Sequence, residues 1–274
     1  EAAIKYFLVG SFASALFLYG IALAYAVTGE TGLRGIAEYL GENEVGGERI
    51  LLAAIGLIGA GLAFKIAAFP FHVWAPDAYQ GPTVPVAAFL AAASKAAGLA
   101  AIGRVCLVAF ASQADTLSHM LTGLAALSII AGSLIAVAQT DMKRLLAYSS
   151  IAHAGYALLG FVAGTHQGVT ATMTYAFLYV FMTLGAFGVV IAVGERGERL
   201  DGYRGLATQR PGLAALMLLF LLALAGIPPT AGFVAKFVVI LSVVKTGQIT
   251  LAVLAVLCSV VTAFVYLRVA VQMY

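Results

Sequence analysis

The sequence predicts an all-α protein, a polytopic bundle of transmembrane helices, from its composition and the length of its apolar runs. Hydrophobic residues make up 62% of the 274 residues and charged residues only 10%, with a mean hydropathy of +1.02. A soluble domain carries about 25% charged residues. Long apolar runs of about 20 residues are the second observation, since that length crosses a bilayer as a helix.

Eight such runs follow one another with short connections, which leaves little room for a soluble domain. Strands of a membrane β-barrel alternate polar and apolar residues in segments of about ten, and these runs are uniformly apolar. The sequence therefore favours helices over a barrel. The predicted spans are 4–27, 50–71, 86–110, 119–139, 144–164, 168–194, 212–244 and 249–273.

Basic residues are distributed unequally between the two sides of the predicted bundle. The side on which the chain begins carries more of them, so the positive-inside rule makes it cytoplasmic, and eight spans return the C-terminus to it. The loop from Gly29 to Arg49 lies on the far side and is rich in Glu. The first side carries Lys5, Lys143, Arg144, Arg196, Arg199, Arg204 and Arg210, and the far side Arg34, Arg49 and Lys245.

Three lysines, Lys65, Lys95 and Lys236, fall inside apolar runs that contain no Asp or Glu. A lysine near the middle of a bilayer costs about 2.5–3.5 kcal/mol even on the lenient insertion scale. Ionisable residues kept at such a cost are functional by default, and we expect these three to handle protons. A structural role in assembly is the alternative, and Lys95 lies too near the centre of its run to reach the headgroups easily.

Two of these lysines lie beside predicted helix interruptions. Pro70 follows Lys65, and a proline breaks or kinks a helix because it lacks an N–H and clashes with the preceding turn. The pair Pro228 and Pro229 precedes Lys236. Two ordinary proline kinks are one interpretation. Paired interruptions in corresponding halves also indicate an inverted-repeat transporter and its ion path, and the adjacent lysines favour that interpretation.

His153 is the histidine placed well inside a predicted span, with Ser149, Ser150 and Tyr156 close to it in sequence. An imidazole can accept at one nitrogen and donate at the other, so it suits a proton relay between lysines. A satisfied packing residue is the alternative. The other histidines fall in connections, which argues against a haem held by two histidines within the membrane.

No sequence pattern for a cofactor or metal is present, and we expect neither in this chain. P-loop, dinucleotide, iron–sulfur and zinc spacings are missing. Cys106 and Cys258 fall in apolar runs, where a free thiol is a more natural reading than a disulfide. Most aromatic residues, including Trp74 and Tyr79, are expected at the membrane interface or facing lipid.

Four segments resemble the antiporter-like membrane subunits of respiratory complex I, and the resemblance covers essentially the whole chain. One difference is Thr183, where we expect Asn. The segments are Phe69-Pro-Phe-His-Val-Trp-Ala-Pro-Asp-Ala-Tyr-Gln-Gly-Pro-Thr-Val-Pro85, Ala93-Ser-Lys-Ala-Ala-Gly98, Gln139-Thr-Asp-Met-Lys-Arg-Leu-Leu-Ala-Tyr-Ser-Ser-Ile-Ala-His153 and Gly226-Ile-Pro-Pro-Thr-Ala-Gly-Phe-Val-Ala-Lys236.

The resemblance implies two inverted helix repeats, each forming a proton half-channel. Residues 1–111 would be three helices that end the first repeat, and residues 112–274 the five helices of the second. Lys65, Lys95, Lys236 and His153 would form the proton relay, with Lys65 paired to a glutamate upstream of Glu1. We accordingly expect the chain, which starts at Glu1 and ends in an apolar run, to belong to a longer protein.

The function implied is proton translocation driven by redox chemistry on other subunits of the complex. The partners would be neighbouring membrane subunits and the lipid bilayer, with no nucleic acid, in a bacterial inner membrane. A subunit of an Mrp-type cation/proton antiporter or of an energy-converting hydrogenase shares these features. A purely structural membrane subunit is a further alternative. A membrane enzyme with its own active site is disfavoured, because no Ser–His or metal constellation falls within the spans.

Overall fold

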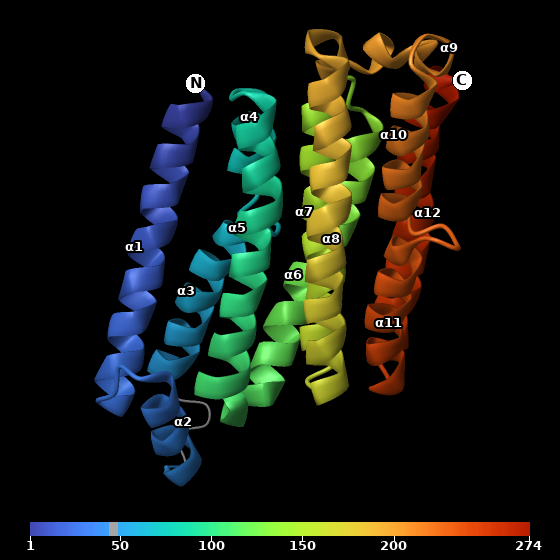
Figure 1. Cartoon of the computed structure of the whole chain (residues 1–274). Coiled ribbons are helices and arrows are strands. Elements are labelled where there is room, and N and C mark those ends of the chain that lie inside the picture. The colour runs from blue at the N-terminus through green and yellow to red at the C-terminus, as the bar shows by residue number, and fades with distance from the viewer. Residues whose placement is uncertain (44–48) are drawn as a thin grey trace.

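The computed structural model describes residues 1–43 and 49–274, and the fold is a bundle of helices that run along one axis (Figure 1). Glu44 and Glu48 lie outside the described residues. Both termini lie at the same end of the bundle, as an even number of crossings requires. Within the described residues the only β pairing is one isolated bridge, Asp141 to Arg199.

In the described part of the chain six helices are long and apolar enough to span a membrane, and the other apolar helices there are shorter. α3 (Arg49–Lys65), α10 (Pro211–Ala225) and α11 (Ala231–Lys245) have 17, 15 and 15 residues. The six long spans are α1 (Ala2–Thr28), α5 (Val84–Arg104) continued by η1 (Val105–Ala109), the α6 helix (Ala114–Val137) preceded by η2 (Ala111–Gln113), α7 (Met142–Val162), α8 (His166–Val193) and α12 (Ile249–Met273).

Helix α7 is the centre of the bundle, with 94% of its span buried. Asp141 caps its N-terminus, where the side-chain carboxylate accepts the N–H of Arg144 at 2.9 Å. Glycines bring α6 against it: a Cβ on Gly155 would lie 2.8 Å from the carbonyl oxygen of Ala125, and one on Gly132 would collide with the backbone of Ala152. The small residues therefore permit close contact between the two backbones.

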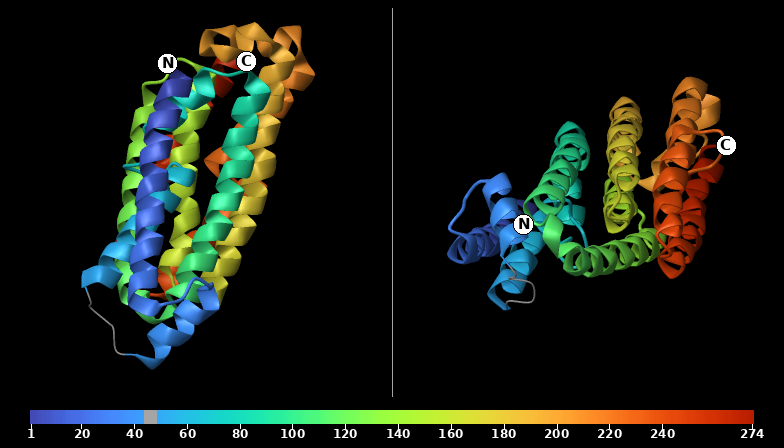
Figure 2. Two further views of the ribbon diagram at one scale, coloured as in Figure 1. Left: turned by 90° about the vertical axis from the view of Figure 1, so that its left-hand side faces the viewer. Right: turned by 90° about the horizontal axis from the view of Figure 1, so that it is seen from below.

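Within the described residues the connections contain five further short helical segments, none of which the sequence predicts. α2 (Leu33–Glu42) lies in the Glu-rich loop, with Ile36 and Leu40 buried one turn apart. α4 (Trp74–Gln80) follows the end of α3. η3 (Glu195–Glu198), η4 (Leu200–Tyr203) and α9 (Leu206–Gln209) join α8 to α10 at the end that holds both termini (Figures 1 and 2).

Helix α3 ends at Lys65, one turn before Pro70, and the chain then forms turns as far as Val73. The proline ring would clash with the carbonyl of the residue four positions earlier, which explains why the helix stops there. The second interruption separates α10 from α11. Gly226 ends α10 in the left-handed region, at φ +79°, and Thr230 caps α11.

Candidate functional site: buried lysines at two helix ends

Lys95 lies on α5 with only 2% of its surface exposed. Its ammonium group donates to two backbone carbonyls, those of Ile66 and Ser150, both at 2.7 Å. Ile66 directly follows the last residue of α3. The last carbonyls of a helix lack intrahelical partners and form the negative end of the helix dipole, so they stabilise a nearby cation.

Lys236 lies on α11, is 4% exposed, and makes a comparable contact at the other interruption. Its ammonium donates to the carbonyl of Ala225, the last residue of α10, at 2.8 Å, and to the hydroxyl of Ser259 on α12 at 3.0 Å. The same nitrogen lies 4.7 Å from the centre of the Tyr156 ring. A cation over an aromatic face is a favourable arrangement in a desolvated site.

One face of α7 lies between the two lysines. It presents Ser150, His153 and Tyr156 at a spacing of three residues, which places their side chains on the same side of a helix. The backbone carbonyl of Ser150 accepts from Lys95, and the ring of Tyr156 lies under the amine of Lys236. His153, midway between them, is 3% exposed.

His153 has a hydrogen-bond partner at each ring nitrogen. Nδ1 lies 2.6 Å from the hydroxyl of Tyr175 on α8, and Nε2 lies 3.3 Å from the hydroxyl of Tyr266 on α12. The Tyr266 hydroxyl also contacts the hydroxyl of Ser149. A hydroxyl both donates and accepts, as does a neutral imidazole, so this set can pass a proton along its members.

The prediction that the aromatic residues face lipid or the interface is wrong for a large group of tyrosines. Trp74 is 3% exposed and its indole donates to the carbonyl of Phe64, so it too is a buried residue. Buried tyrosines keep their hydroxyl groups hydrogen-bonded, which suits them to an interior polar path. The tyrosines with 3% exposure or less are Tyr79, Tyr156, Tyr175, Tyr179, Tyr203 and Tyr266.

No Asp or Glu is buried within residues 1–43 and 49–274. The buried amines of Lys95 and Lys236 therefore have carbonyls, a hydroxyl and an aromatic ring as partners, and no carboxylate, in this part of the protein. Neutral dipoles hold a cation less firmly than a carboxylate does, because they bring no opposite charge. Such amines can hold a proton and release it.

Lys65 differs from the other two lysines, because its side chain is exposed. It is the last residue of α3, and its backbone carbonyl accepts from Ser94 at 3.2 Å. The side chain lines a hollow of about 560 Å³ between α1 and α3, together with Phe17 and Phe64. The structure thus brings Lys95, His153 and Lys236 together and places Lys65 at the side of the bundle.

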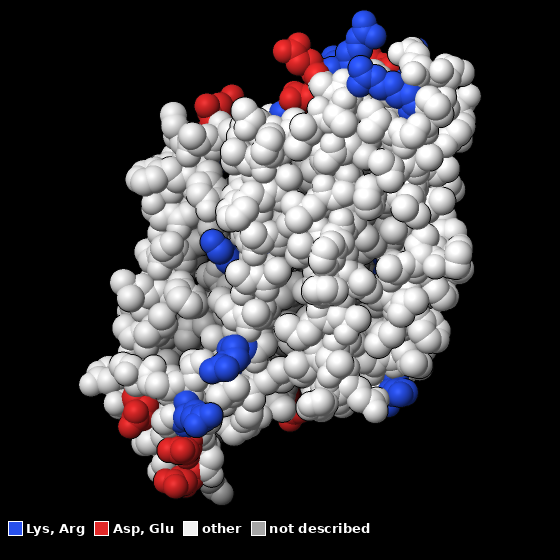
Figure 3. Space-filling model, in the orientation of Figure 1, with Lys and Arg blue, Asp and Glu red and all other residues white. Residues whose placement is uncertain are grey.

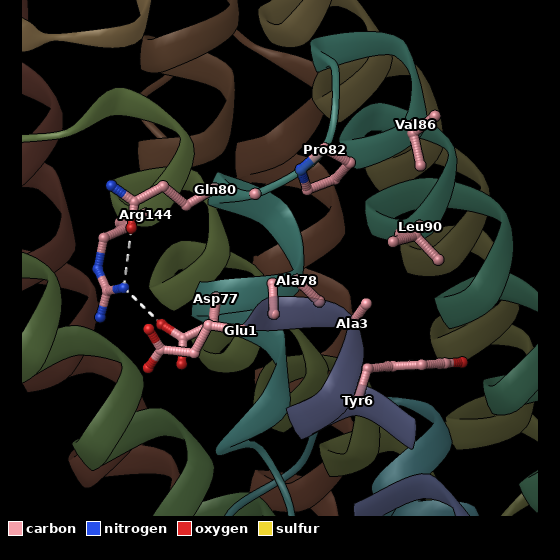
Figure 4. A pocket seen from close by; sticks show the side chains of 12 residues that line it. Glu1, Ala3, Tyr6, Asp77, Ala78, Gln80, Pro82, Val86, Leu90 and Arg144 are labelled. Carbon is pink, nitrogen blue, oxygen red and sulfur yellow. Dashed lines mark hydrogen bonds and ion pairs between the residues drawn. The ribbon is translucent and has the colours of Figure 1, made fainter. Parts of the chain in front are cut away.

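A charged network lies at the end of the bundle that holds both termini. Asp77 on α4 forms ion pairs with Lys5 on α1 and with Arg144 on α7, the latter at 2.7 Å. The Arg144 guanidinium also donates to Gln80, and both of its contacts are drawn in Figure 4. Burial acts to raise the pKa of Asp77, but hydrogen bonds from Lys5 and Arg144 outweigh it and lower the pKa. An adjoining hollow of about 890 Å³ is lined by Tyr6 and other residues.

Lys143, which the sequence placed in a connection, is 3% exposed in the first turn of α7. Its amine forms an ion pair with Glu198 at 3.1 Å and donates to the carbonyl of Pro82 at 3.3 Å. Nothing in the sequence indicates that Lys143 is more buried than the neighbouring Arg144.

Metal-ligating residues do not gather in the described part of the chain, where no group of three or more His, Cys, Asp or Glu lies close enough to hold an ion. Cys106 and Cys258 are free thiols. His72, between α3 and α4, stacks on Phe69 with ring centroids 5.0 Å apart.

Comparison with known families decides what kind of protein carries this arrangement. The family described as NADH:quinone oxidoreductase/Mrp antiporter, TM, matches residues 1–262. The chain belongs to this family. It is a multi-pass membrane protein with an all-α fold, as the sequence predicts, and the bacterial relatives support a location in the inner membrane.

The four sequence segments resemble membrane subunits of respiratory complex I, and subunit N most of all. The curated relatives agree with this resemblance. NADH-quinone oxidoreductase subunit N of Desulfovibrio desulfuricans is 48% identical over 290 residues, and the match covers all of this chain and 57% of that protein. The chain thus spans less than two thirds of the length of the relatives it matches.

Two solved structures show how widely the backbone is shared. A chain of respiratory complex I from Thermus thermophilus is 40% identical, with a TM-score of 0.83 over all of this chain and 59% of that one. A chain of the Mrp complex from Dietzia is 27% identical, with a TM-score of 0.90 over all of this chain and 50% of that one. The fold alone therefore does not separate the two classes, whereas the sequence identity favours complex I.

Proposed function

We propose that this chain translocates protons as part of subunit N of an NADH–quinone oxidoreductase. Membership of the family and 48% identity to a subunit N support the assignment. The observation that carries the mechanism is the pair of buried amines, Lys95 and Lys236, joined by one face of α7.

In the proposed relay each buried lysine holds a proton at the end of an interrupted helix. Desolvation disfavours the charged amine, whereas the carbonyls of Ile66 and Ala225 favour it. Because these two effects oppose each other, a neighbouring charge can shift the amine between its protonated and neutral forms. His153 passes the proton between the lysines, with Tyr175 and Tyr266 fixing its ring, and water completes the path to Lys95.

Lys65 takes the first step in this proposal, by receiving a proton from the cytoplasmic side. Its exposed side chain and its position at the end of α3 are compatible with a donor outside the buried set. A Lys65→Ala change is expected to abolish proton pumping without preventing membrane insertion, and normal pumping by that variant would remove Lys65 from the relay.

The redox chemistry that drives transport is proposed to reside on other subunits, so this chain would take part in the enzyme without holding a redox group. Its partners would be neighbouring membrane subunits of the complex and the lipid bilayer. No role with nucleic acid is proposed. The division at residues 111 and 112 into parts of two inverted repeats also stays a prediction.

The test uses the full-length subunit in its assembled complex, in membrane vesicles energised with NADH. Lys95→Met and Lys236→Met, made separately, are expected to abolish proton uptake measured with a pH-sensitive dye. Methionine keeps the length and packing of the stem and removes the amine. Lys245→Met is the matched control, because Lys245 is exposed and donates to Gln167 at the bundle surface.

Proton uptake that survives both interior substitutions would refute the relay and favour a structural role for the two amines. Loss of uptake in the Lys245→Met control as well would show that the assay responds to any change of charge.

A second candidate is a subunit of an Mrp-type cation/proton antiporter, favoured by the TM-score of 0.90 to the Mrp chain. Sodium dependence of transport separates the two functions. Proton uptake that requires NADH and is unaffected by replacing sodium with choline supports the oxidoreductase. Uptake driven by a sodium gradient without NADH supports the antiporter.

A further inference from the structure

Four arginines surround a hollow in the connection between α8 and α10, away from the proton relay. The hollow has a volume of about 430 Å³. Figure 1 places the connection at the end of the bundle that holds both termini, and Figure 3 shows blue side chains gathered there. The arginines, all exposed, are Arg196, Arg199, Arg204 and Arg210.

The charge inside the hollow is strongly positive. Asp201 is the one acidic residue that lines it, and its carboxylate pairs with Arg199 at 3.1 Å. The nearby acid Glu198 is directed to Lys143 instead, at 3.1 Å. With four arginines and one aspartate, the lining of the hollow carries an excess of positive charge.

Two of the four arginines have free donor groups. Arg210 donates to the carbonyl of Ala192 at 3.0 Å and Arg199 is occupied by Asp201. The guanidinium groups of Arg196 and Arg204 make no hydrogen bond to the residues that the structure describes. The planar guanidinium donates two parallel hydrogen bonds and matches the oxygens of a phosphate group.

The hollow also has apolar lining residues. Val193 and Leu206 line it beside the arginines. Ile191 of α8 and Leu216 of α10, on the two membrane helices that the connection joins, are both 47% exposed. A charged hollow at the end of two helices that expose apolar side chains matches the chemistry of an anionic amphiphile.

We propose that this hollow binds the headgroup of an anionic phospholipid, with its phosphate oxygens accepting hydrogen bonds from Arg196 and Arg204. The acyl chains lie against the exposed apolar side chains of α8 and α10. The positive-inside rule, to which these four arginines themselves contribute, places this end at the cytoplasmic leaflet, where anionic lipids attract basic segments. The inference goes beyond proton translocation and does not depend on it.

The test uses the full-length subunit in its detergent-extracted complex, stripped of lipid and titrated with cardiolipin or with phosphatidylcholine. Bound lipids are counted by native mass spectrometry. The wild-type protein is expected to bind cardiolipin in preference to phosphatidylcholine. The Arg196→Gln/Arg204→Gln variant is expected to bind cardiolipin about 25-fold more weakly, because a basic residue near the surface contributes about 1 kcal/mol, or roughly five-fold.

Two further variants provide controls. Arg34→Gln/Arg49→Gln removes the same charge from exposed residues at the opposite end and is expected to leave cardiolipin binding unchanged. Asp201→Asn removes the competing carboxylate and releases Arg199, so it is expected to strengthen cardiolipin binding. This gain of affinity keeps the proposal testable if the double arginine variant fails to assemble.

Equal binding of the two lipids by the wild-type protein would overturn the proposal, as would unchanged cardiolipin binding in the Arg196→Gln/Arg204→Gln variant. Displacement of cardiolipin by millimolar inorganic phosphate would identify a free-anion site instead. Loss of a neighbouring subunit with no change in bound lipid would identify a protein interface and likewise refute the lipid site.

Discussion

The sites of Lys95 and Lys236 share one feature and differ in another. In both, the ammonium donates to a carbonyl at the end of an interrupted helix, Ile66 in one site and Ala225 in the other. The second partner of Lys95 is a backbone carbonyl of α7. The second partner of Lys236 is a side chain, Ser259.

Because of this difference, a side-chain substitution is expected to remove a hydrogen bond of Lys236 but not one of Lys95. The Lys95 site is built from α3, α5 and α7 with backbone partners, so side-chain substitutions around it leave its hydrogen bonds in place. The Lys236 site depends on Ser259 and on the ring of Tyr156. The second site is therefore expected to be adjustable by single substitutions, and the first to be disturbed chiefly through packing.

Glycine-to-alanine substitutions beside each amine are expected to have the largest effects on stability and transport. Gly226→Ala forces a side chain into the left-handed region, at a cost of about 1–2 kcal/mol, and places a Cβ 2.7 Å from Cδ of Lys236. Gly98→Ala places a Cβ 2.5 Å from the buried Ile66 and overpacks the first site by about 1–3 kcal/mol. Both variants are expected to unfold at lower temperature, with Gly226→Ala also losing transport.

Gly188→Ala is the control for these variants, because a Cβ at Gly188 meets no atom within 4 Å. It is expected to be neutral or stabilising by up to about 1 kcal/mol. Equal transport by Gly226→Ala and Gly188→Ala would contradict the placement of Lys236.

Ser259→Ala removes the hydroxyl partner that only the Lys236 site has. A hydrogen bond to a charged group contributes about 1.5–3 kcal/mol, so the free energy of unfolding is expected to fall by about that amount. Thermal unfolding of the assembled protein measures the change. Ser242→Ala is the control, since that buried hydroxyl donates within its own helix to Val239. Equal effects of the two substitutions would show that Ser259 does not stabilise the amine.

Tyr156 tests the aromatic contact of Lys236. Tyr156→Phe keeps the ring and loses only the hydrogen bond to the carbonyl of Ala255, so transport is expected to continue. Tyr156→Leu also removes the ring, which costs about 0.5–2 kcal/mol of cation–π stabilisation, and transport is expected to fall. NADH-driven proton uptake measures both, and a Phe variant as impaired as the Leu variant would assign the role to the hydroxyl.

Asp77→Asn is expected to have the smallest effect, because its ion pairs lie at the partly exposed end of the bundle. Such pairs contribute about 0.2–1 kcal/mol. The pKa of Asp77 is lowered in the folded protein, so its contribution to stability is present above about pH 4 and lost as the pH falls through the folded value. Thermal unfolding at pH 7 and pH 3 is expected to show less acid sensitivity in Asp77→Asn, and equal sensitivity would contradict the ion pairs.

Much of the fold could be predicted from the sequence, because hydrophobic runs of this length have one common structure. Local chemistry is enough to predict the spans and the end of α3 near Pro70. It is also enough to place the three lysines in apolar runs that contain no Asp or Glu. The helix α2 was missed because its 10 residues, which include Arg34, Glu38 and Glu42, are too few and too charged for a membrane span.

The lysines, His153 and Tyr156 of the candidate site are visible in the sequence, whereas its other tyrosines, Tyr175 and Tyr266, are not. A lysine in an apolar run is conspicuous, whereas a tyrosine there is equally compatible with the membrane interface. Contacts such as Tyr175 and Tyr266 with His153 depend on how α7, α8 and α12 pack, and no local pattern encodes that. The exposure of Lys65 was missed for the same reason.

Arginine in place of each buried lysine tests the central claim most directly, because arginine keeps the positive charge but is not deprotonated in proteins. If the amines exchange protons, Lys95→Arg and Lys236→Arg complexes will show no more NADH-driven proton uptake than the methionine variants. Proton uptake at the wild-type rate by either arginine variant would contradict the account, because a fixed charge would then be sufficient.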